Sequence, residues 1–179
     1  MHSGDSAGAA RAGFWRDVGS QLRAALPPFR QSLVGALLWA AAMAASAALG
    51  LSMRGWETPA SFGAVVSLFA AGGAVAFPIA LFLARLLGLR RRREAAFAGA
   101  FLSFSIVTIG VTAFSFALIY RLYYARWHEE MFTIIWAFQL FFTVAAALAQ
   151  FAVLGIRLFF PLGFAALFAV SLWFCAKAR

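Results

Sequence analysis

The side chains best suited to chemistry gather in one short segment, Arg126-Trp127-His128-Glu129-Glu130. An imidazole beside two carboxylates can bind a metal ion or move a proton. The segment supplies neither a third metal ligand nor a nucleophile, so it predicts a solvated loop with an interfacial tryptophan. Its acids then favour the start of the next helix through the helix dipole. The alternative is a surface site in which His128 works with Glu129 or Glu130.

The remaining ionisable residues exclude most other chemistry. All six acids lie outside the long apolar segments, at Asp5, Asp17, Glu57, Glu94, Glu129 and Glu130. A carboxylate proton relay or a divalent-metal site within those segments therefore lacks its ligands. His2 is the only other histidine and Cys175 the only cysteine, which argues against haem, iron–sulfur and cysteine–zinc sites. With no GxxxxGK[ST], GxSxG or HExxH motif, we expect no catalytic residue, no metal and no intrinsic cofactor.

The composition indicates the solvent that surrounds these residues. The 179 residues are 64% hydrophobic and 12% charged, with a mean hydropathy of +0.88, too few polar groups for a water-facing globule. The net charge of +9 comes from basic residues at the ends of apolar segments. Arg90–Arg93 are therefore expected to contact anionic lipid head groups. The sequence predicts an integral membrane protein and no binding of nucleic acid.

The apolar segments predict an all-α bundle of about five transmembrane helices over residues 31–179. Each has about the 20 residues that a membrane crossing needs, and they cover residues 33–53, 62–89, 97–120, 131–150 and 158–176. A single helix over residues 131–176 would be about 70 Å long, so we expect a hairpin that turns near Gly155 and Arg157. Four crossings with an interfacial or re-entrant C-terminal segment are the alternative.

Residues 1–30 are expected to form a cytoplasmic tail with an amphipathic interfacial helix. From residue 12 to residue 26, apolar and aromatic residues share one helical face and arginines the other, as at a membrane surface. The residues expected at the interface are Phe14, Trp15, Arg16, Leu22 and Arg23. Pro27-Pro28 should end the helix. Alternatively, its apolar face contacts a partner subunit.

The distribution of basic residues predicts the orientation. With five crossings, ten basic residues lie on the side of the N-terminus and five on the other. The positive-inside rule then places the N-terminus in the cytoplasm and the C-terminus outside, in a membrane such as the bacterial inner membrane. Trp56, Trp127 and Trp173 would all lie at the outer interface.

Small residues at helical spacing predict close helix packing. In the second apolar segment they recur every four residues, at Gly72, Ala76, Ala80, Ala84 and Gly88. In the first they recur at Ala40, Ala44 and Ala48. These stripes could bind another chain or pack within the bundle. Pro78 and Pro161 are expected to kink their helices.

Function follows mainly from what the segments lack. Without ionisable residues in the membrane or a soluble domain, the chain is expected to be a non-catalytic subunit of a larger membrane complex or a homo-oligomer. Its 21 phenylalanines could contact lipid, quinone or pigment. The alternative is a small oligomeric transporter or channel for an apolar or zwitterionic solute, using Gln139, Gln150 and the backbone at Pro78. A surface enzyme built on His128 ranks third.

Overall fold

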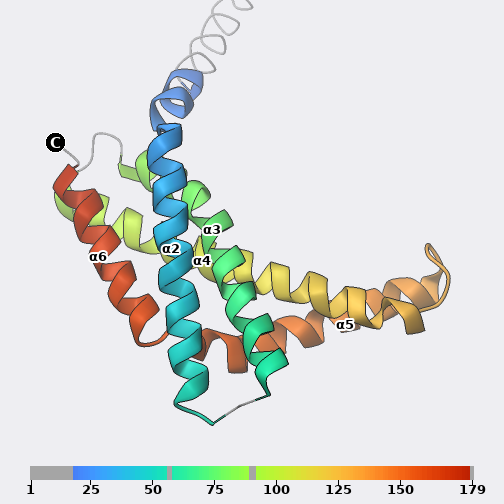
Figure 1. Ribbon diagram of the computed structural model, residues 1–179. Coiled ribbons are helices and arrows are strands. Elements are labelled where there is room, and N and C mark those ends of the chain that lie inside the picture. The colour runs from blue at the N-terminus through green and yellow to red at the C-terminus, as the bar shows by residue number, and fades with distance from the viewer. Residues whose placement is uncertain (1–17, 56–57, 89–91, 178–179) are drawn as a thin grey trace, which may run out of the picture.

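The computed structural model describes residues 18–55, 58–88 and 92–177, and all regular elements in these ranges are helices (Figure 1). Four helical stretches are long and apolar enough to cross a membrane: Phe29–Ser52, Pro59–Gly88, Arg93–Trp127 and Ile134–Phe159. A shorter apolar helix, Leu162–Lys177, follows them. The chain is therefore an all-helical protein with several helices suited to a membrane, as its composition predicts.

The first described residues lead into helix α2 (Phe29–Ser52). Residues 18–25 are helical and residues 26–28 are not, because neither Pro27 nor Pro28 has an N–H for a helical hydrogen bond. Leu22 and Arg23 are exposed, whereas Phe14, Trp15 and Arg16 lie outside the described residues.

Helices α2 and α3 (Pro59–Gly88) pack closely because small residues line their contact. A Cβ added at Gly73 would lie 2.9 Å from Met43 Cγ and 3.2 Å from the Trp39 carbonyl oxygen. On the same helix, Ala76, Ala80 and Ala84 are fully buried. The stripe predicted on this segment therefore packs within the chain's own bundle.

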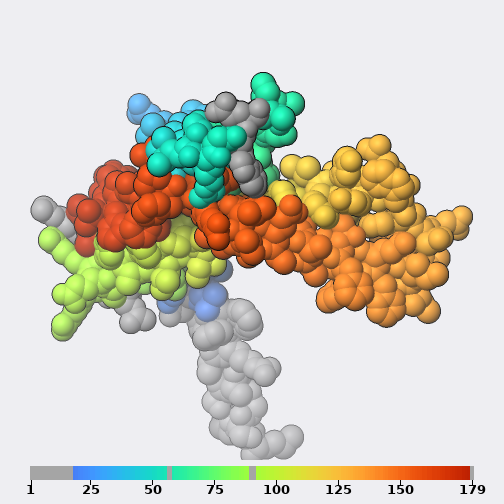
Figure 2. Space-filling view, turned by 90° about the horizontal axis from the view of Figure 1, so that it is seen from below, coloured from blue at the N-terminus to red at the C-terminus, as the bar shows by residue number. Residues whose placement is uncertain are grey.

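Helix α4 (Arg93–Tyr124) is longer than one perpendicular crossing needs. Its 32 residues span about 48 Å at 1.5 Å per residue. It packs against α3, α5 and α6, and η1 (Ala125–Trp127) follows it. Residues 117–150, which comprise the end of α4, η1, the next loop and α5 (Ile134–Gln150), form a hairpin that we call the arm. Figures 1 and 2 show this yellow and orange hairpin projecting from the rest of the molecule.

Two short irregular helices connect the arm to the last helix. They are the π-helical η2 (Phe151–Gly155) and the 3-10 helix η3 (Ile156–Phe159), and α6 (Leu162–Lys177) begins three residues later. The helical path continues through Gly155 and Arg157 to Phe159, so the turn predicted at those residues lies a few residues later, at Phe160 and Pro161. Pro161 precedes α6 instead of kinking it, because a helix start needs no hydrogen bond from that residue's nitrogen. Pro78 lies inside α3, and the kink expected there stays a prediction.

Helix α6 returns to the end of the molecule at which α2 begins. Cys175 Sγ lies 3.3 Å from the Arg93 carbonyl oxygen, and a Cβ added at Gly88 would lie 3.2 Å from the Phe174 ring. Arg85 on α3 donates a 2.9 Å hydrogen bond to the Leu26 carbonyl oxygen. These contacts bring the start of α2, the end of α3, the start of α4 and the end of α6 together at what we call the Arg85 end.

The opposite end, which we call the Arg54 end, holds the connection between the arm and α6. The Ser46 hydroxyl donates to the Leu158 carbonyl oxygen at 2.9 Å and accepts from the Gly163 N–H at 3.0 Å. These bonds fasten η3 and the start of α6 to the last turns of α2. Helix α4 begins at the Arg85 end, and α5 leads to the Arg54 end. The two helices together therefore make one net passage from one end of the molecule to the other.

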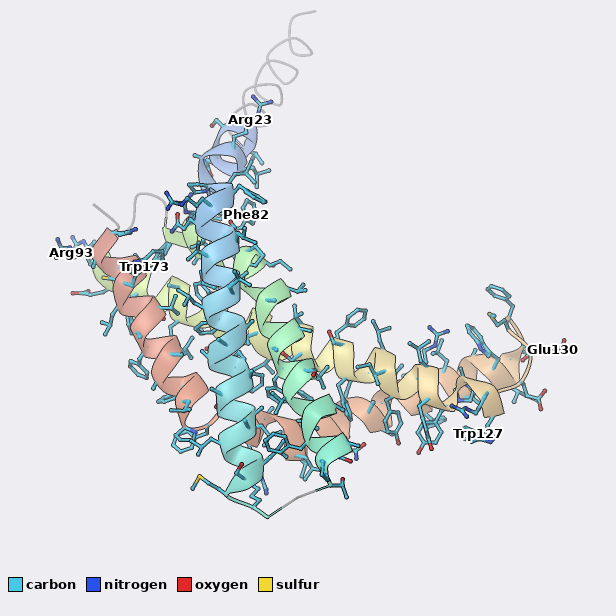
Figure 3. The ribbon with its side chains drawn as sticks, viewed as in Figure 1. Arg23, Phe82, Arg93, Trp127, Glu130 and Trp173 are labelled. Atoms are coloured by element: carbon cyan, nitrogen blue, oxygen red, sulfur yellow. The ribbon has the colours of Figure 1, made fainter. Side chains whose placement is uncertain are left out.

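This path differs from the predicted five-span arrangement. That arrangement grouped Arg157 with Arg85 and grouped Trp173 with Trp127, whereas the structure does neither. Figure 3 shows Trp173 near Arg93, far from Trp127 and Glu130 at the tip of the arm. The physical reason is that the apolar run after residue 131 first returns along α4 and only then turns into α6.

Candidate functional site

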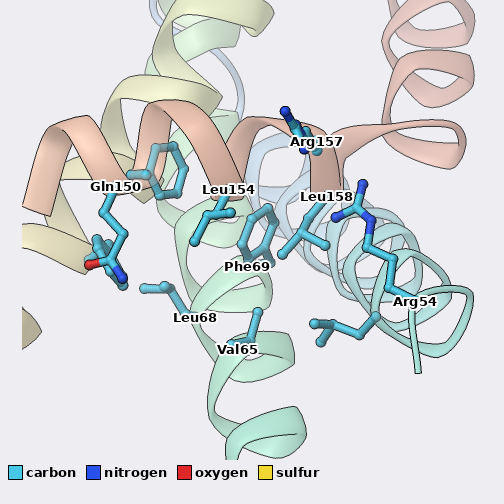
Figure 4. Close-up of a pocket in the computed structure, with 12 residues that line it drawn as sticks. Arg54, Val65, Leu68, Phe69, Gln150, Leu154, Arg157 and Leu158 are labelled. Atoms are coloured by element: carbon cyan, nitrogen blue, oxygen red, sulfur yellow. The ribbon is translucent and has the colours of Figure 1, made fainter. Parts of the chain in front are cut away.

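A pocket of about 450 Å³ lies at the Arg54 end, where α2, α3, α4 and the η2–η3 segment meet (Figure 4). Its volume falls within the range of small-molecule sites. Most of its lining is apolar, and three polar side chains interrupt it: Arg54, Gln150 and Arg157. In the view of Figure 4, the two arginines lie toward one side of the pocket and Gln150 toward the other.

The backbone positions each arginine at a helix boundary. After α2, the Arg54 N–H bonds to the Leu51 carbonyl oxygen at 3.0 Å, and Gly55 has a φ of 65°. Glycine adopts this left-handed conformation without steric cost, so the turn that follows the end of α2 at Ser52 can close directly after Arg54. Arg157 lies in η3, where the chain turns from the arm toward α6.

Aromatic packing forms the floor of the pocket. The Phe69 ring lies 4.8 Å from the Phe159 ring and 6.2 Å from the Phe151 ring, measured between centroids. Phe116 on α4 lies 6.0 Å from Phe151. Phe69 is only 1% exposed, so three separate parts of the chain fix this floor. The adjacent π-helical η2 is a form that is rare and often found at functional sites.

The pocket combines positive charge with apolar walls. No Asp or Glu is among its lining residues in the described part of the chain. Guanidinium groups recognise carboxylates and phosphates through paired hydrogen bonds. The arrangement can bind an anionic group next to a hydrocarbon chain, and the lining offers neither a general base nor a nucleophile for covalent chemistry.

The polar cluster predicted at His128 is separate from this pocket, and its hydrogen-bonding contacts join the loop to α5. His128 Nε2 lies 3.3 Å from Thr143 Oγ1, and the Glu129 N–H donates to Gln139 Oε1 at 2.9 Å. Within the described ranges, no group of three or more His, Cys, Asp and Glu could hold a metal ion. The geometry favours the solvated loop, and the residue that caps α5 is Thr133, whose hydroxyl accepts from the Trp136 N–H at 3.1 Å.

Aromatic and basic side chains surround that loop at the tip of the arm. The Arg126 guanidinium lies 5.4 Å from the Tyr123 ring and 5.1 Å from the Trp127 ring, and Arg121 lies 5.9 Å from Trp136. Cation–π contacts of this kind suit the boundary between lipid and water. The expected interfacial place of Trp127 is consistent with this environment. Trp56 lies outside the described residues.

The other predicted residues are dispersed over the molecule. Gly72 faces Thr112 on α4 and Gly88 faces Phe174 on α6, while Ala40, Ala44 and Ala48 on α2 are partly buried. The transport path proposed from polar residues is not assembled: Gln139 is in the arm, Gln150 is at the pocket and Pro78 is inside α3. Arg92 and Arg93 are exposed, and Arg90 and Arg91 lie outside the described residues.

Sequence reasoning missed two features. Trp39, only 5% exposed, donates a 3.0 Å hydrogen bond to Thr108 beside a second cavity of about 340 Å³. It also missed that Arg54 and Arg157 line the same pocket, because the predicted topology placed them on opposite sides of the membrane. The polar break at Arg157 in a long apolar run was the only available signal.

Comparisons with protein-family models, curated proteins and solved structures find no match to this chain. Its function is therefore inferred from its own geometry.

Proposed function

We propose that the chain is a non-catalytic subunit of a membrane protein assembly and that its arm docks against another membrane-embedded chain. The observation that carries this proposal is the poor burial of α5. In the most apolar window of the helical stretch Ile134–Phe159, which begins with α5, only 11% of the residues are buried, compared with 44% for Pro59–Gly88, which is α3. Helices in lipid associate through close packing, and α5 packs on little besides α4 and η2.

The exposed face of α5 suits a protein partner. The large exposed aromatic side chains of Phe138, Phe141 and Phe142 are followed, about one and two helical turns later, by the small exposed residues Ala145 and Ala149. Small residues allow a second helix to approach closely, and aromatic side chains fill the remaining space. The partner is therefore expected to present one or more apolar membrane helices.

A non-catalytic role is supported by the polar side chains of the core. In the described residues these are hydroxyls: Ser46, Ser103, Thr108, Thr112 and Ser171. Thr112 and Ser171 bond to backbone carbonyls one turn earlier, as polar side chains do inside membrane helices. Intramembrane catalysis usually relies on ionisable groups, which this core does not contain.

We further propose four crossings, made by α2, α3, the α4–α5 unit and α6, with both ends of the chain in the cytoplasm of a bacterial inner membrane. An even number of crossings is supported by two contacts at the Arg85 end, because Leu26 before α2 bonds to Arg85 and α6 ends beside the start of α4. Among the described residues, Arg23, Arg30, Arg85, Arg92, Arg93 and Lys177 belong to segments that meet at the Arg85 end. Arg54, Arg121, Arg126 and Arg157 lie elsewhere, so the positive-inside rule favours a cytoplasmic Arg85 end.

The docking proposal is tested by purification in a mild detergent. Phe138→Ala with Phe142→Ala removes two exposed rings one helical turn apart and should release the partner. The matched control is Leu33→Ala with Leu37→Ala, which removes two exposed side chains at the same spacing on α2. Partner loss in the arm variant alone supports docking, whereas equal retention in both variants contradicts it.

The same preparation tests the alternative. A chain that migrates alone or as a homo-oligomer and moves a solute into liposomes would be a transporter or channel.

A further inference from the structure

The pocket at the Arg54 end brings two positive charges together in a largely apolar space. Arg54 follows α2 and Arg157 lies in η3, more than a hundred residues later in the chain. Both side chains are exposed, and an anion that accepts hydrogen bonds from both would offset the repulsion between their like charges. No acidic side chain is part of the described lining.

The remainder of the lining is hydrocarbon. Leu68, Phe69, Phe116 and Leu154 continue the pocket away from the arginines, and Gln150 is the other polar side chain that borders it. A small hydrophilic anion would leave these apolar walls in contact with water, which is unfavourable. An uncharged apolar ligand would leave both guanidinium groups without a counter-ion.

We propose that this pocket binds one anionic amphiphile, with its carboxylate or phosphate at Arg54 and Arg157 and its acyl chain along Leu68, Phe116 and Leu154. The charged head satisfies both guanidinium groups. The acyl chain of the ligand covers the aromatic floor at Phe69, where α3 meets η2 and η3.

The position of the pocket fits a ligand that arrives from the membrane. Arg54 lies two residues beyond the end of α2, a 24-residue helix about 36 Å long, so the guanidinium lies close to the head-group level. Basic pockets between membrane helices bind anionic head groups on the cytoplasmic side of a membrane, and the same pairing of a guanidinium with a phosphate or carboxylate applies at the Arg54 end. The proposal concerns a ligand site and does not depend on whether the arm docks to a partner.

Lipid binding to the full-length protein, measured by native mass spectrometry, tests the proposal. The probes are phosphatidylglycerol and oleate, which supply a phosphate and a carboxylate head, and phosphatidylcholine as a zwitterionic reference. We expect the protein to bind one molecule of phosphatidylglycerol, or one molecule of oleate, more tightly than phosphatidylcholine. The preferred probe distinguishes a phospholipid from a free fatty acid as the ligand.

Three variants assign that binding to the pocket. Arg54→Gln with Arg157→Gln should weaken it roughly 10- to 100-fold, as expected for the loss of charged hydrogen bonds. Leu68→Trp keeps both charges, fills the space for the chain and should also weaken binding. Arg121→Gln with Arg126→Gln removes two charges from the arm and should leave the first binding event unchanged.

Thermal unfolding first shows that the variants remain folded, so that a change in lipid binding can be assigned to the substituted side chains. Weakening in both pocket variants but not in the arm variant supports the site. Equal weakening in the pocket and arm charge variants would show general attraction to the protein's positive charge and would overturn the proposal. Equal binding of phosphatidylcholine, or wild-type affinity in the pocket variants, would also overturn it.

Discussion

The bundle of α2, α3 and α6 with the first part of α4 differs sharply from the arm, although both are strongly apolar. In α3, glycine and alanine bring neighbouring backbones close together, so that Ala76 and Ala80 are fully buried. In α5, phenylalanines point outward and Phe141 is 65% exposed. Hydropathy alone therefore explains why both regions belong in a membrane, whereas small residues explain which of them packs on itself.

The largest difference should appear when the same aromatic side chain is removed from each region. Phe104 is fully buried and lies 5.3 Å from the rings of both Trp39 and Phe77, measured between centroids. Phe104→Ala should lower the free energy of unfolding by roughly 3–5 kcal/mol, because a cavity remains. Phe142→Ala should change it by less than about 0.5 kcal/mol.

Thermal unfolding in detergent measures both changes. Similar losses in the two variants would mean that the arm is part of the folded core.

A smaller effect is expected from overfilling the seam of the bundle. Ala80→Leu adds volume at a site with no exposed surface and should destabilise the bundle by about 1–3 kcal/mol. The matched control is Ala71→Leu on the exposed face of α3, which should be nearly neutral. Leu81, next to Ala80 in the chain, is fully buried and cannot serve as a control. Equal tolerance at Ala80 and Ala71 would contradict the close packing of α3.

The smallest effect concerns one hydrogen bond within the bundle. Trp39→Phe removes the donor to Thr108 Oγ1 and should lower the free energy of unfolding by about 1 kcal/mol. A double-mutant cycle with Thr108→Val isolates the bond from the change in ring size. Purely additive effects in the cycle would show that this bond contributes nothing to stability.

The sequence predicts the bundle better than the arm for a physical reason. Periodic small residues such as Gly72 and Ala76 identify a packed helix face, and Pro27-Pro28 marks a helix end, because both act through local geometry. The direction of α6 depends instead on long-range contacts such as the bonds between Ser46 and the η3–α6 segment. No spacing in the sequence encodes those contacts, so the predicted topology separated Arg54 from Arg157.

The candidate site was predictable only in part. Arg157 is conspicuous as a charge in an apolar run, and an arginine at a turn avoids the centre of the bilayer. Its neighbours in space, including Leu68 and Phe116, come from helices whose relative placement only the folded chain defines. His128, Glu129 and Glu130 stand out in the sequence instead, because these residues are close together along the chain.

The central claim is that α4 and α5 together make one net crossing, so that both ends of the chain lie on the same side. Alkaline phosphatase and green fluorescent protein fused after residue 179 test it directly, with fusions after Gly55 as the control for the other side. We predict a fluorescent, phosphatase-inactive C-terminal fusion and the opposite result after Gly55. An active phosphatase after residue 179, together with the expected result at Gly55, would contradict the claim and restore the arrangement with five crossings.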